Sequence, residues 1–152
     1  MKKLFAIVLT FALLASLSVT AFAANTTGGK ADITTSIAPT YTVTIPADVN
    51  VQFNATETAF GAIEVTASQI HPDKCIKVAL TTDNELNNAI DNTKVIPYAI
   101  KDSEGAEFAS ATYLTEGDKT ELSIYITAND WDAAYAGDYS DTVTFTVSYE
   151  DK

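Results

Sequence analysis

The sequence predicts an all-β protein, an antiparallel β-sandwich of about seven to nine short strands. The clearest of these strands is the last, Tyr139–Glu150, in which apolar or aromatic residues alternate with Thr and Ser. This period of two places the two kinds of side chain on opposite faces of an extended chain. Further short alternating runs recur at spacings of about ten residues, and no convincing helical period follows the N-terminal apolar run.

Residues 1–23 have the layout of a secretory signal peptide. Lys2 and Lys3 give a positive start, Leu4–Leu17 is almost wholly apolar, and Ala21-Phe22-Ala23 is a small-x-small cleavage site. The apolar run is too short and wrongly flanked for a membrane-spanning helix. We therefore expect cleavage after Ala23, which leaves 129 residues, enough for one domain with a sizeable core. The expected location is secreted, either extracellular or at the cell surface, without membrane insertion after cleavage.

The charge of the mature chain excludes several classes of partner. Seven lysines and no arginine face 20 acidic residues, a net charge of −13. Such a chain is repelled by phosphate backbones and by anionic lipid, so nucleic-acid and membrane-surface binding are disfavoured. Arginine is also the best side chain for forked recognition of carboxylate or phosphate, so anionic ligands are poor candidates. We interpret the acidity mainly as a device for solubility.

Residues 24–38 come before the body of the predicted sandwich, residues 39–152. Asn25–Lys30 is polar and Gly-rich, whereas Ala31–Ile37 alternates Ala, Ile, Thr and Ile with polar residues and is typical of a short strand. Pro39 ends this strand because proline cannot donate to a ladder. The segment is either the kinked first strand of its own sandwich or an extension that is donated to another subunit.

The predicted strands of the body follow one another with turn residues between them. Asp102–Gly105 is a hairpin turn signal, and Pro97 places its strand at a sheet edge. Ahead of the final strand, the expected strands are Tyr41–Ile45, Val49–Phe53, Ile63–Thr66, Ile76–Leu80, Glu85–Ile90, Ile96–Ile100 and Leu122–Ile126.

The stretch Ala128–Gly137 is expected to be a loop or a single helical turn, with a weak helical signal at Asn129–Ala136. Trp131, Tyr135 and Tyr139 cluster around it. If exposed, these rings would form a sugar-stacking platform or a protein-contact patch; if buried, they would plug the end of the sandwich. We favour burial.

Four acidic residues crowd the same region and are candidate calcium ligands, because carboxylate oxygens suit Ca²⁺. They lack the Asp-x-Asp-x-Asp-Gly spacing of an EF-hand, so we favour solvated loop carboxylates and expect neither a metal nor a cofactor. The four are Asp130, Asp132, Asp138 and Asp141.

The sequence gives no support for an enzyme. His71 is the only histidine and Cys75 the only cysteine. The Pro-Asp turn between them does not determine whether their side chains lie close together. A nucleophile needs a nearby base, and one His with one Cys cannot fill a tetrahedral zinc site without carboxylates. Cys75 is either a small core residue or an exposed thiol at the start of a strand, and we favour the core residue. A single cysteine forms no disulfide within the chain.

Two stretches resemble a known group of proteins. Ala136–Tyr149, with the pattern Ala-Gly-x-Tyr-x-Asp-x-Val followed by alternating Thr and apolar residues, resembles the last strand of spore coat protein U-like and pilin-type secreted sandwiches. Tyr41–Pro46 looks like the first core strand of small secreted β-sandwich proteins of Gram-positive bacteria. The resemblance implies an immunoglobulin-like subunit that polymerises by strand donation, with Ile33 and Ile37 as plugging side chains. Those pilins often carry a Cys pair, which is absent here.

These observations lead to two functional hypotheses. The first is a secreted bacterial surface protein with a structural or adhesive role, a fibre, pilus or coat subunit that associates with itself or with another surface protein. The second is a monomeric module that binds a glycan or a protein through the Trp131 loop.

Overall fold

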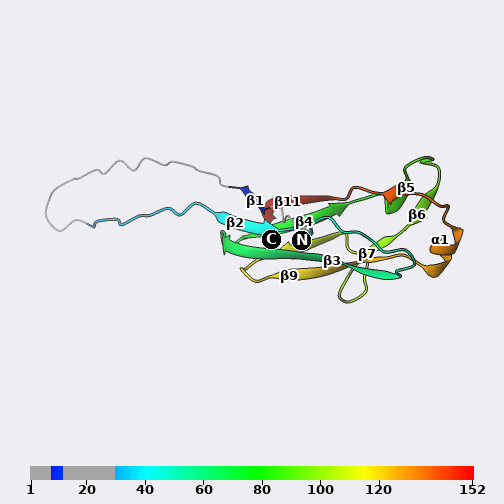
Figure 1. Cartoon of the computed structure of the whole chain (residues 1–152). Coiled ribbons are helices and arrows are strands. Elements are labelled where there is room, and N and C mark those ends of the chain that lie inside the picture. Colours follow the sequence, from blue (N-terminus) through cyan, green and yellow to red (C-terminus); the bar gives the residue numbers. More distant parts are fainter. Residues whose placement is uncertain (1–7, 12–29) are drawn as a thin grey trace, which may run out of the picture.

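The computed structural model describes residues 8–11 and 30–152, which form two packed β-layers with one short helix at one end (Figure 1). Most of the predicted signal peptide, and residues 24–29 of the predicted extension, lie outside the described residues. The fold is the predicted all-β antiparallel sandwich. It has ten strands between residues 40 and 151, more than expected because two predicted strands are each broken into two and one strand, β8, was not predicted.

The first layer is a single antiparallel sheet of five strands. A bulge in β3, between Ala59 and Gly61, interrupts its pairing with β9. In spatial order the strands are β1 (Val8–Phe11), β2 (Thr40–Thr44), β3 (Glu57–Gln69), β9 (Lys119–Tyr125) and β7 (Ala99–Asp102).

The second layer consists of two three-stranded sheets that follow one another along the molecule. In the first of them, β11 (Thr144–Asp151) pairs with β4 (Lys74–Thr81), which pairs with β8 (Ser110–Tyr113). The chain continues from β4 into the second sheet and crosses to the first layer between β6 and β7. The second sheet has the order β10 (Tyr139–Ser140), β5 (Glu85–Asn88), β6 (Val95–Pro97).

The core lies where the alternating apolar residues of the two layers meet. Ile63 and Val65 of β3 face Ile76 and Val78 of β4, and all four are completely buried. Burial of a side chain of this size stabilises the fold by about 1.5–3 kcal/mol. In each strand these two residues are β-branched and two positions apart, a spacing that places both on the same face of a pleated sheet.

Among the described residues, the order of the main strands follows that of an immunoglobulin sandwich as far as its F strand, with β8 as an additional strand beside β4. β2, β3, β9 and β7 take the A, B, E and D positions, and β4 and β11 take the C and F positions. The G position, on the outer side of β11, is taken by no strand among the described residues. β11 is therefore an edge strand, although its sequence alternates as regularly as that of an inner strand.

Two predicted strands are wrong. Ala31–Ile37 pairs with nothing in its own sandwich among the described residues, and the stretch from Lys30 to Ala38 is exposed at every position. Val49–Phe53 alternates as a strand does but has no neighbour to pair with, and it runs as irregular chain beside the sandwich. Alternation fixes which side chains share a face, whereas a strand also needs a partner for its backbone.

Other boundaries also differ from the prediction. β3 begins at Glu57, earlier than the predicted Ile63, and β8 was not predicted, because Ser-Ala-Thr-Tyr carries little apolar signal. The predicted strand at Ile96–Ile100 is divided between the two layers. Pro97 does lie on an edge strand, as predicted. The helical turn is α1 (Ala128–Ala133), capped by the Thr127 hydroxyl, which accepts a hydrogen bond from the Asp130 N–H.

Gly137 allows the chain to enter β10. Its φ is +148°, and a Cβ there would lie 2.6 Å from Nδ2 of Asn88. Asn88 is buried and cannot swing away cheaply, because its Oδ1 accepts hydrogen bonds from the N–H groups of Ile90 and Asp91. The position therefore requires glycine for two reasons, its backbone conformation and the space that Asn88 occupies.

We expect Gly137→Ala to lower the free energy of unfolding by about 2–4 kcal/mol, because backbone strain and the clash with Asn88 add together. Gly105→Ala is the matched control: Gly105 has a φ of +83° but nothing within 4 Å of the added Cβ. That variant should lose only about 1–2 kcal/mol. Urea unfolding measures both, and equal losses would show that the contact with Asn88 carries no energy.

Candidate functional site

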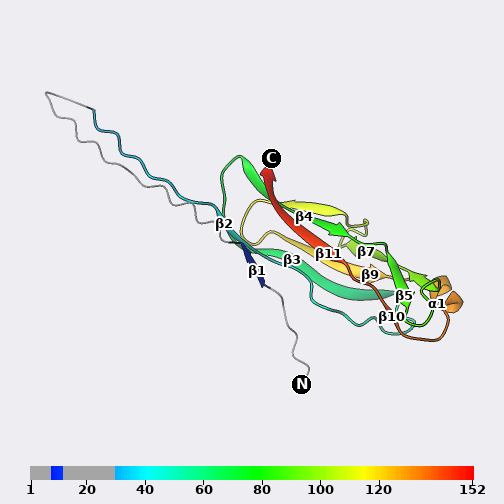
Figure 2. The same cartoon turned by 90° about the horizontal axis from the view of Figure 1, so that it is seen from above.

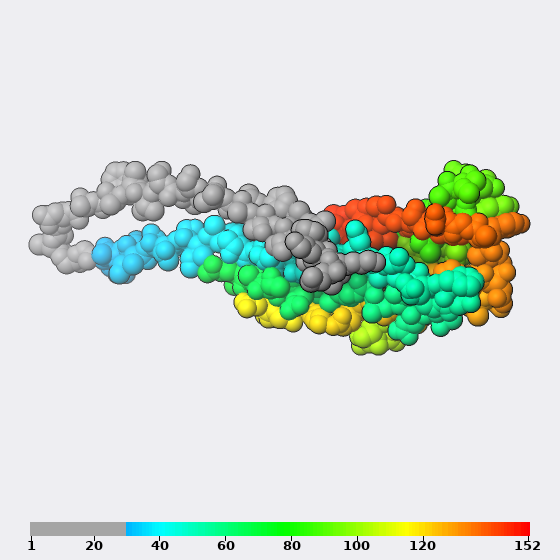
Figure 3. Space-filling view, in the orientation of Figure 1, coloured from blue at the N-terminus to red at the C-terminus, as the bar shows by residue number. Residues whose placement is uncertain are grey.

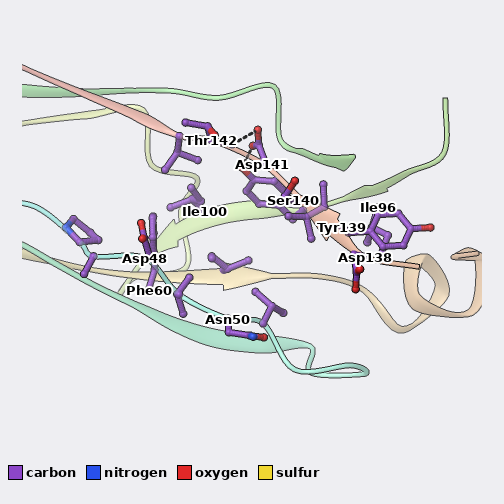
Figure 4. Close-up of a pocket in the computed structure, with 18 of the residues that line it drawn as sticks. Asp48, Asn50, Phe60, Ile96, Ile100, Asp138, Tyr139, Ser140, Asp141 and Thr142 are labelled. Atoms are coloured by element: carbon purple, nitrogen blue, oxygen red, sulfur yellow. Dashed lines mark hydrogen bonds between the residues drawn. The ribbon is translucent and has the colours of Figure 1, made fainter. Parts of the chain in front are cut away.

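An open groove of about 750 Å³ runs along the seam between the two layers (Figure 4). One wall is the irregular segment Ile45–Phe53, and the other is the chain from Gly137 to Phe145. The second wall leads into β11, whose Phe145 lines the groove, so the groove opens beside the edge of β11 that pairs with no described strand. We call this feature the open groove.

The floor of the open groove is formed by the hydrophobic core. Ile96 and Ile100 are almost completely buried by their neighbours, yet both line the groove. Phe60 and Phe145, whose ring centroids are 6.0 Å apart, contribute a pair of tilted aromatic rings. The groove is therefore apolar at its base.

Polar side chains line the rim of the groove on both walls. Asp48 and Asn50 project from one wall (Figure 4). The opposite wall carries Asp138, Ser140, Asp141 and Thr142.

Contacts on the first layer position the Ile45–Phe53 wall. Pro46 lies against Gly61 at the bulge of β3, where an added Cβ would be 3.5 Å from the Cβ of Pro46. At the far end, the Trp131 indole N–H donates a 2.9 Å hydrogen bond to the carbonyl oxygen of Ala55, and the Trp131 ring meets Phe53 edge-on. The wall is thus attached near both ends without being a strand.

A partly buried hydrogen-bond cluster fixes the opposite wall. The Tyr98 hydroxyl donates to Oδ2 of Asp141, and the Thr82 hydroxyl donates to the same oxygen at 3.1 Å. The other carboxylate oxygen of Asp141 accepts from the N–H of Thr142 at 2.6 Å. Because Asp141 is turned inward to these partners, the final strand is interrupted between β10 and β11.

The cluster changes the acidity of Tyr98. Burial, and then the hydrogen bond to the Asp141 carboxylate, raise the pKa of the Tyr98 phenol well above its usual range. The phenol is therefore neutral near neutral pH and donates its hydrogen bond to Asp141.

The outer side of β11 is incompletely covered. Phe145, Val147 and Tyr149 point toward the core side of the sheet but are only half-buried, whereas Ile76 and Val78 of the neighbouring β4 are fully buried. Among the described residues β11 pairs with β4 alone. Its other side leaves backbone N–H and C=O groups without a ladder partner.

The described part of the N-terminal extension projects from the body (Figure 3). We call Lys30–Ala38 the extension segment. Ile33 is 99% exposed and buries almost nothing in its own subunit, whereas Ile37 is 63% exposed and lines a small pocket beside Ile70. The segment leaves from the end of the sandwich opposite α1 (Figures 1 and 2).

The aromatic residues that were predicted to cluster take three different environments. Trp131 is half-buried and lines the open groove, and Tyr139 donates its hydroxyl to the carbonyl oxygen of Tyr135 at 3.0 Å. Tyr135 is 64% exposed, and the Lys94 ammonium lies 5.0 Å from its ring centroid. The side chains therefore do not form a single buried plug, since Tyr135 faces solvent.

The weak calcium candidates gain no geometric support. In residues 30–152, no three His, Cys, Asp or Glu side chains gather as a metal site would require. Asp130 accepts a hydrogen bond from the hydroxyl of the helix cap Thr127, and Asp141 belongs to the Tyr98 cluster. Asp132 and Asp138 are exposed.

His71 and Cys75 lie in different environments. Cys75 is buried, with its Sγ 3.7 Å from the carbonyl oxygen of Asp151, whereas His71 is exposed. The His71 backbone N–H donates to the Tyr149 hydroxyl at 2.9 Å. The predicted core role of Cys75 agrees with its burial.

Comparisons with known proteins do not assign a family. No family model, no curated protein and no solved structure matches the chain. The resemblance of Ala136–Tyr149 to coat protein U-like and pilin-type proteins therefore stays a prediction. Among the described residues, no helix is long and apolar enough to cross a bilayer.

Sequence reasoning missed most of the open groove. Of the residues that line it, Trp131, Tyr139, Asp138 and Asp141 were among the predicted candidates. Phe60, Tyr98 and the wall Ile45–Phe53 were not considered as site residues. The one available signal was the regular alternation of Val49–Phe53, which indicated apolar side chains facing the sandwich. The link between Tyr98 and Asp141, 43 residues apart, leaves no pattern in the sequence.

The raised pKa of Tyr98 predicts a loss of stability at alkaline pH. The unfolded phenol ionises near pH 10, so the stabilisation is fully present below about pH 10 and is lost as pH rises toward the folded pKa. Tyr98→Phe should cost about 1 kcal/mol at pH 8 through the lost hydrogen bond. Its unfolding free energy should then fall less steeply than that of the wild type between about pH 9 and pH 11.

Urea unfolding at several pH values measures this difference. Tyr41 and Tyr113 also have raised pKa values through burial, so the variant should keep part of the slope. The exposed Tyr135→Phe serves as the control for loss of a tyrosine. Parallel curves for the wild type and Tyr98→Phe would contradict the assignment.

Proposed function

We propose that the chain is a secreted bacterial surface protein, a fibre or coat subunit that assembles by strand donation. In this proposal, the extension segment of one copy fills the open groove of the next. One observation carries the proposal: among the described residues, an apolar groove opens beside the unpaired edge of the final strand, and an extended segment with an apolar face lies outside the core of the same subunit.

The chemistry of the two parts is complementary. Ala31, Ile33, Thr35 and Ile37 share one face of an extended chain, and a groove with Ile and Phe on its floor suits such a face. Nine residues extend over about 30 Å. The backbone of a donated strand would also satisfy the free N–H and C=O groups on the outer side of β11.

The partner that fits best is a second copy of this chain. To fold back beside its own β2, the extension segment would need a tight hairpin at Ala38-Pro39. Two-residue hairpin turns need positive φ values, whereas proline fixes φ near −65°. Because donor and acceptor are different surfaces, the contact is head-to-tail and does not close on itself, which generates a fibre.

The distribution of charge supports the same arrangement. Residues 39–152 carry 19 acidic residues and six lysines, whereas the extension segment carries only Asp32 and Lys30, whose charges cancel. Two bodies therefore repel each other, and the extension segment is the part of the described chain that approaches a neighbour without adding to this repulsion.

We expect the purified mature protein to increase in mass with concentration and to give a ladder of subunit multiples on an unboiled denaturing gel. Deleting residues 24–38 should abolish the ladder and leave a folded monomer, since the extension segment contributes nothing to the core. Light scattering gives the mass. A monomer at every concentration, with residues 24–38 present, would rule out strand donation.

Single substitutions should show which face of the extension segment contributes to association. Ile33→Asp should weaken association by about 10-fold to 100-fold, because burying such a side chain is worth about 1.5–3 kcal/mol. Thr34→Asp is the matched control, since it adds the same charge on the opposite face. Equal losses in the two variants would indicate a general charge effect rather than a plugging side chain.

The second candidate is a monomeric module that binds a glycan or a protein. The observation that favours it is the lining of the open groove, where Trp131 and Tyr139 lie near Asp48, Asn50 and Asp138. Aromatic faces beside carboxylates and amides suit a sugar. On this hypothesis, a glycan array should give a ligand that shifts the fluorescence of Trp131, the only tryptophan. A silent array and an unchanged spectrum would remove this candidate.

A further inference from the structure

The large apolar side chains that stay exposed gather at the two ends of the elongated molecule. Among the described residues they number seven, and only Val49, in a wall of the open groove, lies away from both ends. The other six divide equally: Ile33, Ile37 and Leu114 lie at the end that carries the extension segment, and Phe53, Ile90 and Tyr135 lie at the end that carries α1.

Contacts around α1 place three of these side chains at one end of the sandwich. Phe53 meets the ring of Trp131, which belongs to α1, and Tyr135 follows that helix closely in the chain. The Lys94 ammonium lies 5.0 Å from the ring centroid of Tyr135. Lys94 belongs to the loop between β5 and β6, which also carries Ile90. We call Phe53, Ile90 and Tyr135 the α1-end patch.

The loop that carries Ile90 is held by its own hydrogen bonds. Oδ1 of Asn88 accepts a 2.9 Å hydrogen bond from the N–H of Ile90. Oδ1 of Asp91 accepts from both the N–H and the hydroxyl of Thr93. Ile90 is nevertheless 91% exposed. Because the loop is already ordered, packing this side chain against a partner costs little conformational entropy.

At the opposite end, Leu114 lies near the point where the extension segment joins the body. The Ser68 hydroxyl donates a 3.3 Å hydrogen bond to the carbonyl oxygen of Leu114, and Ser68 faces Tyr41 near the start of β2. The turn is fixed by Asp118, whose carboxylate accepts hydrogen bonds from the N–H groups of Leu114 and Thr115.

Strand donation brings the body of one copy to an end of the groove of another. The extension segment joins its own body at Pro39, so a segment that fills a neighbour's groove leaves its body where that groove opens. Trp131 and Asp138 line the groove at the α1 end. The other direction follows β11, and none of the exposed large apolar side chains of the described body lies along that strand. The α1 end is therefore the one that offers an apolar surface to an arriving body.

We propose that the α1-end patch of one copy packs against the extension end of the copy whose segment fills its groove. This inference rests on the proposed strand donation and adds a second contact between the same two copies. Leu114 and its turn supply the apolar surface on the donor's body. Once the segment is seated, the second contact forms within one complex, so a small patch is sufficient. It also prevents the donor's body from turning freely about Pro39.

The charges at the two ends favour this pairing over a contact between two α1 ends. Residues 89–94 and 128–138, around α1, carry four aspartates and one lysine. The turns of the opposite end, residues 69–74 and 114–119 with residues 151–152, carry three lysines and four acidic side chains. Two α1 ends therefore repel each other more strongly than an α1 end repels an extension end. The partner that fits the patch is the extension end of a second copy.

Substitutions in the patch test this contact in the mature chain. The double variant Ile90→Ser, Tyr135→Ser removes two apolar surfaces without adding charge, and Ile90→Leu, Tyr135→Phe is the matched control that keeps them. We expect the serine variant to associate about tenfold more weakly in a light-scattering concentration series, because it loses buried apolar area, and the control to match the wild type. Urea unfolding should be alike in all three proteins, since both side chains are exposed in the subunit. Equal association of the two variants would overturn the inference.

A labelled peptide of residues 24–38 distinguishes the patch from the groove. The acceptor is the mature Ile33→Asp chain, whose own donor is weakened, with and without the two serine substitutions. We expect equal binding to both acceptors in fluorescence anisotropy, because the peptide carries no body that could reach the patch. If peptide binding falls as much as association does, the two residues act on the strand seat, and the inference is wrong.

A cross-link identifies which ends meet. In a Cys75→Ala background, one copy carries Ile90→Cys and a second, marked by a tag, carries Leu114→Cys. After the copies are mixed, a short bismaleimide should join Ile90→Cys to Leu114→Cys more than it joins two copies of Ile90→Cys. Introducing Ile33→Asp into both copies should remove that product. A predominance of Ile90→Cys pairs would indicate a symmetric contact between α1 ends and would overturn the inference.

The outcomes separate this inference from the proposed function. A wild type that assembles and whose Ile33→Asp form binds the peptide, with a serine variant that associates equally well, would remove only the contact between bodies. A chain that neither assembles nor binds the peptide would remove strand donation, and the second contact with it.

Discussion

The one-sided pairing of β11 is the constraint on which the rest of the structure depends. The strand gains its hydrogen bonds and packing from β4, and its apolar face looks partly into the open groove instead of into a closed core. Edge strands are normally shortened, charged or covered because they invite pairing with other chains. β11 has eight residues and alternates regularly. A long, regular edge beside an apolar groove is costly for a monomer and is useful for a subunit that receives a strand.

The groove stays open because its walls are attached elsewhere. Pro46 lies against Gly61 on the first layer and the Trp131 indole holds Ala55, so the segment Ile45–Phe53 cannot close onto β11. On the other side, the Asp141 carboxylate accepts hydrogen bonds from Tyr98 and Thr82. These bonds turn the chain inward before β11 begins. Buried polar clusters whose members are all satisfied favour a single arrangement. The spacing of the walls is therefore set by contacts that are independent of any occupant.

The sequence was sufficient for the parts of the fold that depend on local pattern. The alternation of Thr, Val and Phe identified β11, the Asp102–Gly105 turn was recognised from its residue types, and Pro97 correctly indicated an edge. The pairing of strands could not be predicted from local pattern in the same way. Val49–Phe53 alternates as well as β2 does, yet only β2 has a neighbour, and that neighbour is fixed by the three-dimensional arrangement. For the same reason the open groove could not be found, since its walls and floor come from segments far apart in the chain.

The exposure of Ile33 and Ile37 bears on both the open groove and the unpaired edge of β11. A side chain with 99% of its surface in water contributes nothing to the stability of its own subunit, so packing within the monomer does not explain why two isoleucines stand at alternate positions of an extended segment. Pro39 directs that segment away from its own β2, and the mutual repulsion of the acidic bodies opposes any broad contact between copies. On the proposed strand donation, a narrow, neutral strand with an apolar face enters the groove at the open side of β11, avoids this repulsion and buries both isoleucines. The unpaired edge of β11 and the exposed extension segment are, on this proposal, the two halves of one interaction between subunits.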